Sequence, residues 1–126
     1  MNGWLLAAGI TALGVAAVHI VGGHRDVVRP LLTCGLADEP KHVLHAVWHM
    51  VSGDLVLSGI ALLYLSLTDG RPGTGLVAWF VAAHFTAYAA VFLVVTLTVG
   101  WPRPLLRLPQ WILLLPVAML AAAGAT

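Results

Sequence analysis

Residues 38–52 read DEPKHVLHAVWHMVS and place three histidines at the head of a long apolar segment. A helix turns about 100° per residue, so the other two histidines fall within about 60° of His45 on the helix surface. Asp38 and Ser52 lie on the same stripe if the helix includes both ends of the stretch. One face of this helix therefore carries a carboxylate, three imidazoles and a hydroxyl.

The composition around this stretch is that of a bilayer protein. The 126 residues are 60% hydrophobic and only 9% charged, with a mean hydropathy of +0.97. Soluble domains are about 25% charged, so these few charges cannot cover a water-facing surface. We expect the lipid bilayer as a partner. A formal net charge of +1 gives no electrostatic case for nucleic acid.

Apolar runs and the breaks between them predict an all-α membrane protein, a four-transmembrane-helix up-down bundle that forms a single domain over residues 1–126. The predicted helices cover residues 3–23, 41–67, 75–99 and 105–124. Each is long enough to approach the ~30 Å of a hydrocarbon core. Pro30 is expected to stop any continuation of the first helix, whereas Pro109 and Pro116 interrupt the fourth.

Basic residues gather at one set of helix ends. Five flank the first and third connections, namely Arg25, Arg29, Lys41, Arg103 and Arg107. Only Arg71 lies on the other side. The positive-inside rule then places those two connections in the cytoplasm. We expect a multi-pass protein of a bacterial plasma membrane with both termini extracytoplasmic.

Small residues predict close helix contacts. Gly9 and Gly14 lie in the first helix, and Ser58 and Gly59 lie in the second. Such positions let another helix approach closely. We expect a homo-oligomer or docking to a larger membrane complex.

Histidines on three predicted helices fall at compatible depths. His19 and His49 lie at nearly the same level, His45 is one turn nearer the cytoplasm, and His84 is deeper. Ionisable groups inside a bilayer are costly and usually functional, and imidazole is the commonest metal ligand. We predict that these four side chains bind one transition metal ion, iron or zinc.

Two further polar residues accompany the predicted ligands. Asp54 lies about 140° from His49, off the histidine stripe. It either orients the imidazole of His84 as a supporting carboxylate or lies at an oligomer contact, and we favour the first. Asp38 is a second carboxylate that could complete the metal shell. Tyr88 is a candidate proton donor, so Asp54 and Tyr88 are the candidate catalytic residues.

Two resemblances extend this interpretation. The spacing of His42, His45 and His49 resembles a histidine box of integral-membrane di-iron desaturases and hydroxylases, which carry several boxes where this chain has one. The chain is also similar to small four-helix membrane cytochromes b, whose haem is held by single histidines on separate helices. That resemblance implies haem b held by a pair of histidines from among His19, His49 and His84, and no motif fixes which pair.

Three functions follow from these patterns. The leading one is an intramembrane histidine cluster that binds a transition metal or haem b for redox or hydrolytic membrane chemistry. The first alternative is a proton-relay or small-substrate transport module that uses the same side chains. The second alternative is an accessory subunit of a larger membrane complex. Whether the chain is an enzyme stays open.

Overall fold

The computed structural model describes residues 1–68 and 70–126, which form helices and no strand. In chain order the elements are α1 (Gly3–Gly23), the π-helix η1 (His24–Val28), α2 (Arg29–Thr33), α3 (Asp38–Leu67), α4 (Thr74–Thr98), α5 (Pro104–Arg107) and α6 (Gln110–Gly124). The all-helical prediction is confirmed. The second predicted helix begins earlier than expected, at Asp38.

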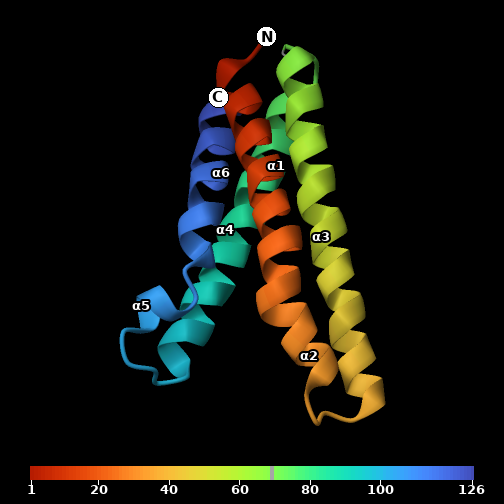
Figure 1. Cartoon of the computed structure of the whole chain (residues 1–126). Helices are drawn as coiled ribbons and strands as arrows, with labels where there is room; N and C mark the ends of the chain where they lie inside the picture. Colours follow the sequence, from red (N-terminus) through yellow and green to blue (C-terminus); the bar gives the residue numbers. More distant parts are fainter. Residues whose placement is uncertain (69) are drawn as a thin grey trace.

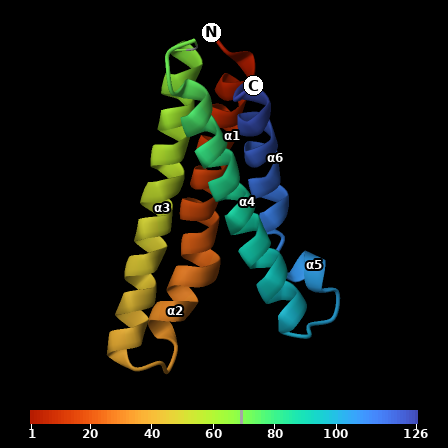
Figure 2. The same ribbon diagram turned by 180° about the vertical axis from the view of Figure 1, so that it is seen from behind.

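The central helix is α1, which packs against α3 on one side and α6 on the other (Figure 1). Helix α4 packs against α6 and contacts α3 only to a limited extent. Seen from behind, the lower ends of α3 and α4 lie apart (Figure 2). The order around the bundle is therefore α3, α1, α6 and α4.

Both termini lie at one end of the bundle (Figure 1). Asn2 joins them, because its Nδ2 donates to the carbonyl oxygen of Gly124 at 3.0 Å. Its Oδ1 also caps α1 by accepting from the backbone N–H groups of Trp4 and Leu5 at 3.1 and 3.2 Å. The connections from α2 to α3 and from α4 to α5 lie at the opposite end (Figure 1).

Three helical segments are long and apolar enough to cross a membrane, judged by length and composition. They are Gly3–Thr33, Asp38–Leu67 and Thr74–Thr98. The predicted fourth helix over residues 105–124 is divided into α5 and α6 at Pro109, one of the two prolines predicted to interrupt it. The 15 residues of α6 span about 22 Å, less than a hydrocarbon core of ~30 Å.

The two prolines of this region behave differently. Pro109 precedes α6 with backbone angles outside the helical region, whereas Pro116 lies inside the helix. A proline inside a helix leaves one carbonyl without its donor and crowds it. Of the two predicted interruptions, only the one at Pro109 breaks the helix, and α6 continues through Pro116.

Pro30 does not stop the first helical segment, contrary to the prediction. The segment continues through η1 and α2 to Thr33. The backbone N–H of Arg29 donates to the carbonyl of His24, five residues back, which widens the turn just before the proline. The wider turn gives the ring room beside the preceding carbonyls, and a helix interrupted in this way can continue.

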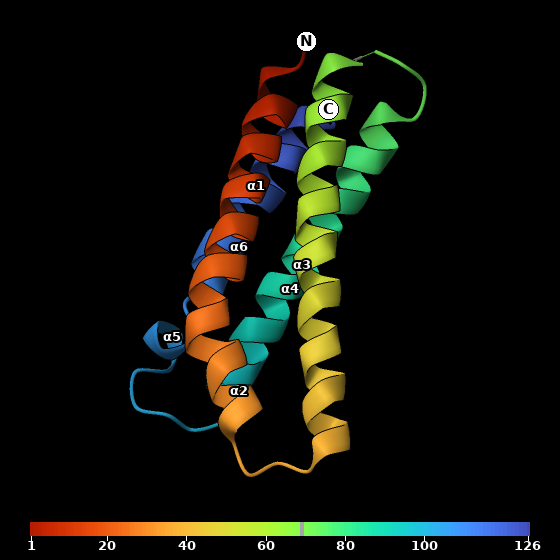
Figure 3. The ribbon, with the colours of Figure 1, turned by 45° about the vertical axis from the view of Figure 1, so that its right-hand side comes forward.

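Two glycines lie in the contact between α1 and α3, helices that lie side by side in Figures 1 and 3. A Cβ added at Gly9 would lie 2.8 Å from Cδ2 of Leu63, and one added at Gly59 would lie 2.8 Å from Cδ2 of Leu13. Both glycines are buried within the chain. The predicted close helix contacts at Gly9 and Gly59 are therefore contacts within the chain. Self-association or docking to a larger complex stays a prediction. A Cβ at Gly14 would have no atom within 4 Å among the described residues.

Candidate functional site

A polar network joins α3 and α4 where these helices otherwise make little contact. Nε2 of His84 lies 2.8 Å from Oδ2 of Asp54. The hydroxyl of Tyr88, one turn further along α4, donates to the same oxygen at 3.2 Å. The predicted contact between Asp54 and His84 is confirmed, and the predicted donor Tyr88 joins it.

This network lies at mid-length of α3. At about 1.5 Å per residue, Asp54 is about 24 Å from the start of a helix about 45 Å long. The side chains of Asp54 and His84 keep 36% and 27% of their surface exposed, so protein atoms do not seal the pair. Among residues 1–68 and 70–126, Nδ1 of His84 makes no hydrogen bond.

A second pair lies nearer the start of α3. Nε2 of His49 is 3.1 Å from Nε2 of His45, and the ring centroids are 4.7 Å apart. Side chains four residues apart meet on one helix face, so the predicted convergence of these two imidazoles is confirmed. One ring must donate and the other accept, which fixes opposite tautomers at their Nε2 atoms.

His19 does not join either group. Its ring stacks on the indole of Trp48, with centroids 3.9 Å apart and planes at 14°. Its Nε2 is buried and has no hydrogen-bond partner in the described part of the chain. The indole also covers Gly23, where any Cβ would overlap it. Sequence reasoning missed this stacking; the only signal is a glycine on α1 that leaves room for a large neighbour.

The structure does not support the predicted four-histidine cluster. Within residues 1–68 and 70–126, no group of three or more histidines, cysteines and carboxylates could hold a metal ion together. The reason is that the predicted ligands have different partners on α3. The ring of His19 stacks on the indole of Trp48, whereas the imidazole of His84 contacts the carboxylate of Asp54. The ligand sets of four for a metal and of three for haem b are thus separated into smaller groups.

The outer residues of the stripe have local partners. Nδ1 of His42 donates to the carbonyl of Asp38 at 2.8 Å, and the Asp38 carboxylate lies 3.8 Å from Nζ of Lys41. Ser52 donates to the carbonyl of Trp48 at 2.9 Å. Neither Asp38 nor Ser52 therefore completes a shared site with the histidines.

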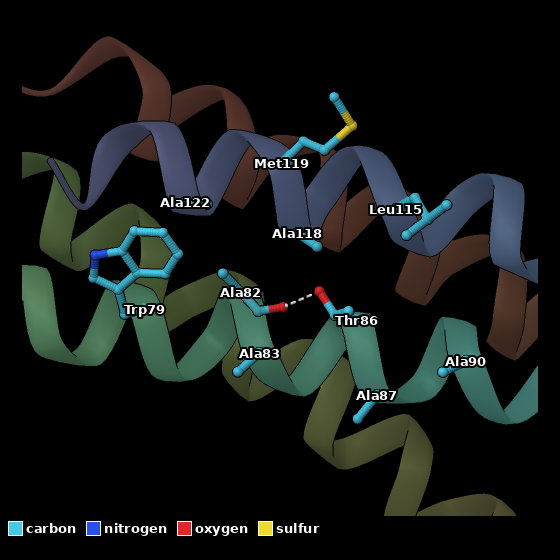
Figure 4. Close-up of a pocket in the computed structure, with 10 residues that line it drawn as sticks. All are labelled: Trp79, Ala82, Ala83, Thr86, Ala87, Ala90, Leu115, Ala118, Met119 and Ala122. Carbon is cyan, nitrogen blue, oxygen red and sulfur yellow. Dashed lines mark hydrogen bonds between the residues drawn. The ribbon is translucent and has the colours of Figure 1, made fainter.

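An apolar hollow of about 470 Å³ lies between α4 and α6, away from these polar groups (Figure 4). Its polar side chain is Thr86, whose hydroxyl donates to the carbonyl of Ala82 at 2.8 Å. The remaining lining residues are Trp79, Ala83, Ala87, Ala90, Leu115, Ala118, Met119 and Ala122. Such a lining offers dispersion contacts and no group for chemistry.

Comparison of the chain with protein families, with characterised proteins and with solved structures finds no match. We therefore infer function from the geometry of the two polar groups.

Proposed function

We propose that this chain is an integral membrane protein with its bundle axis across the bilayer and both termini outside the cytoplasm. The outward surface of the bundle supports the membrane location, because large apolar side chains there expose more than half of their area. Examples are Leu57, Ile60, Leu67, Leu76, Phe80 and Met119. Monomeric soluble proteins rarely expose contiguous apolar patches above a few hundred Å². In this proposal α5 and α6 together complete the fourth crossing.

The function that the geometry favours is a proton relay, carried by Asp54, His84 and Tyr88. The single observation behind it is that one carboxylate oxygen near the proposed bilayer centre accepts from both an imidazole and a phenol. An isolated charge at that depth is expensive, so ionisable groups there usually pair and mark ion or proton pathways.

The chemistry of the relay uses the two nitrogens of one ring. With Nε2–H of His84 held by Asp54, a proton can bind at Nδ1 and form an imidazolium beside the carboxylate. The pair is then neutral overall, which lowers the cost of the charge in hydrocarbon. Transfer of the Nε2 proton to Oδ2 of Asp54 then leaves a neutral ring with hydrogen on Nδ1, so the proton enters at one nitrogen and leaves from the other. Tyr88 gives the carboxylate a second donor in both states, which keeps it aimed at the histidine.

The test is proton flux in proteoliposomes that enclose a pH-sensitive dye, with potassium and valinomycin clamping the membrane potential. Vesicles with wild-type protein should respond to an external pH step faster than protein-free vesicles. Asp54→Asn and His84→Ala should reduce the rate to that of protein-free vesicles, because each removes one half of the proton-binding pair. Tyr88→Phe should reduce it partly.

Matched controls come from the same chain. Tyr64→Phe removes a phenol exposed on α3, and Asp38→Asn removes a carboxylate at the helix end. Both should leave the flux at the wild-type level. The proposal is wrong if wild-type vesicles respond like protein-free ones, or if Asp54→Asn, folded by circular dichroism, conducts as wild type does.

A further inference from the structure

We infer that His45 and His49 form a separate two-histidine site for a divalent first-row transition metal ion, with Zn²⁺ as the representative ion. This site shares no residue with the proton relay. Its two Nε2 atoms lie beside α3 at 3.1 Å from each other. Water supplies the remaining ligands, so the site needs no third protein side chain.

The distance between the nitrogens suits one shared ion. Zinc binds imidazole nitrogen at about 2.0–2.1 Å, and two such bonds to atoms 3.1 Å apart enclose an angle of about 98°. That value lies between the ~90° of an octahedral and the ~109° of a tetrahedral centre, so the separation of the two nitrogens suits either geometry. Without an ion, each of the two Nε2 atoms has the other as its hydrogen-bond partner.

Metal binding changes only the tautomers of the pair. Without metal, one Nε2 carries the hydrogen that the other accepts. A ligand must be an unprotonated nitrogen, so both rings take the tautomer with hydrogen on Nδ1 when they bind the ion. No net proton has to leave a neutral ring, and two metal–nitrogen bonds replace one hydrogen bond.

The position along α3 places the pair near one end of the proposed crossing. A helix of 30 residues is about 45 Å long and matches the full ~40–45 Å of a bilayer with its headgroups. His45 and His49 lie about 10 and about 16 Å from the start of α3, in the outer part of the hydrocarbon core just below the headgroup region. On the surface of the chain His49 is exposed and His45 is partly exposed. In this proposal an ion and its waters enter from this end of α3.

The experiment measures Zn²⁺ binding by titration calorimetry on the full chain in detergent micelles, purified with a tag that contains no histidine. We expect saturation at a single ion per chain. His45→Ala and His49→Ala should each weaken binding by more than about 10–100-fold, the loss typical for removing only a supporting residue. Because both side chains are on the surface, the variants should stay monodisperse.

The matched control is His42→Ala on the same helix stripe. Its Nδ1 is held by the carbonyl of Asp38, so the affinity of this variant should equal that of wild type. His24→Ala, an exposed histidine on η1, should also leave it unchanged. The inference is overturned if wild-type protein does not bind Zn²⁺, or if His45→Ala and His49→Ala bind as tightly as wild type. Equal losses in His42→Ala would overturn it as well.

Discussion

Gly9 and Gly14 lie on the same helix, α1, yet alanine should have opposite effects at the two positions. At Gly9, the new Cβ would lie 2.8 Å from Cδ2 and 2.9 Å from the backbone nitrogen of Leu63. Comfortable carbon contacts are about 3.5–4.0 Å, so α1 and α3 must separate by several tenths of an ångström. At Gly14 the new methyl group has no atom of the described residues within 4 Å.

The change in the free energy of unfolding has two terms, a steric cost and a gain in helix propensity. Overpacking of this kind costs about 1–3 kcal/mol. Replacing glycine by alanine inside a helix gains up to about 1 kcal/mol at either position. Gly14→Ala should therefore be neutral or stabilising, and Gly9→Ala should be destabilising. The difference between their free energies of unfolding cancels the helix-propensity gain and leaves the steric cost of about 1–3 kcal/mol.

Reversible unfolding in mixed detergent micelles with increasing SDS, followed by tryptophan fluorescence, measures this difference. Gly59→Ala should cost less than Gly9→Ala, because the backbone nitrogen of Leu13 is 3.2 Å from the new Cβ and the closer atoms belong to a side chain. The double variant should lose less than the sum of the two, because one separation of the helices relieves both contacts. Equal stability of Gly9→Ala and Gly14→Ala would refute the reasoning.

Two further predictions concern the ends of the bundle. Asn2→Ala should destabilise the chain by about 1 kcal/mol through loss of the α1 cap. Amide hydrogen exchange should then become faster in the first turn of α1 and near Gly124. Unchanged exchange rates at both ends would contradict this prediction. A reporter fused after Thr126 should report an extracytoplasmic location, since the basic residues flank the opposite helix ends, and cytoplasmic activity of that fusion would reverse the proposed orientation.

Local geometry was accessible from the sequence. Long apolar runs predicted the three long helices, because a helix is the way a single apolar segment satisfies its own backbone groups in hydrocarbon. The convergence of His45 and His49 also followed, since four residues bring two side chains onto one helix face whatever the helix packs against. The backbone around prolines was less accessible: Pro30 and Pro116 are accommodated within helical segments, whereas Pro109 ends one.

Only the tertiary structure decided which faces turn inward. The helices are apolar all round, so periodicity could not show that Gly9 and Gly59 pack within the chain. It could not choose between the two interpretations of Asp54 either, because that choice depends on where α4 passes α3. Compatible depths suggested a common site for the histidines, but depth fixes one coordinate alone. The rotation of each helix, set by side-chain packing, assigned His19 to Trp48 and His84 to Asp54.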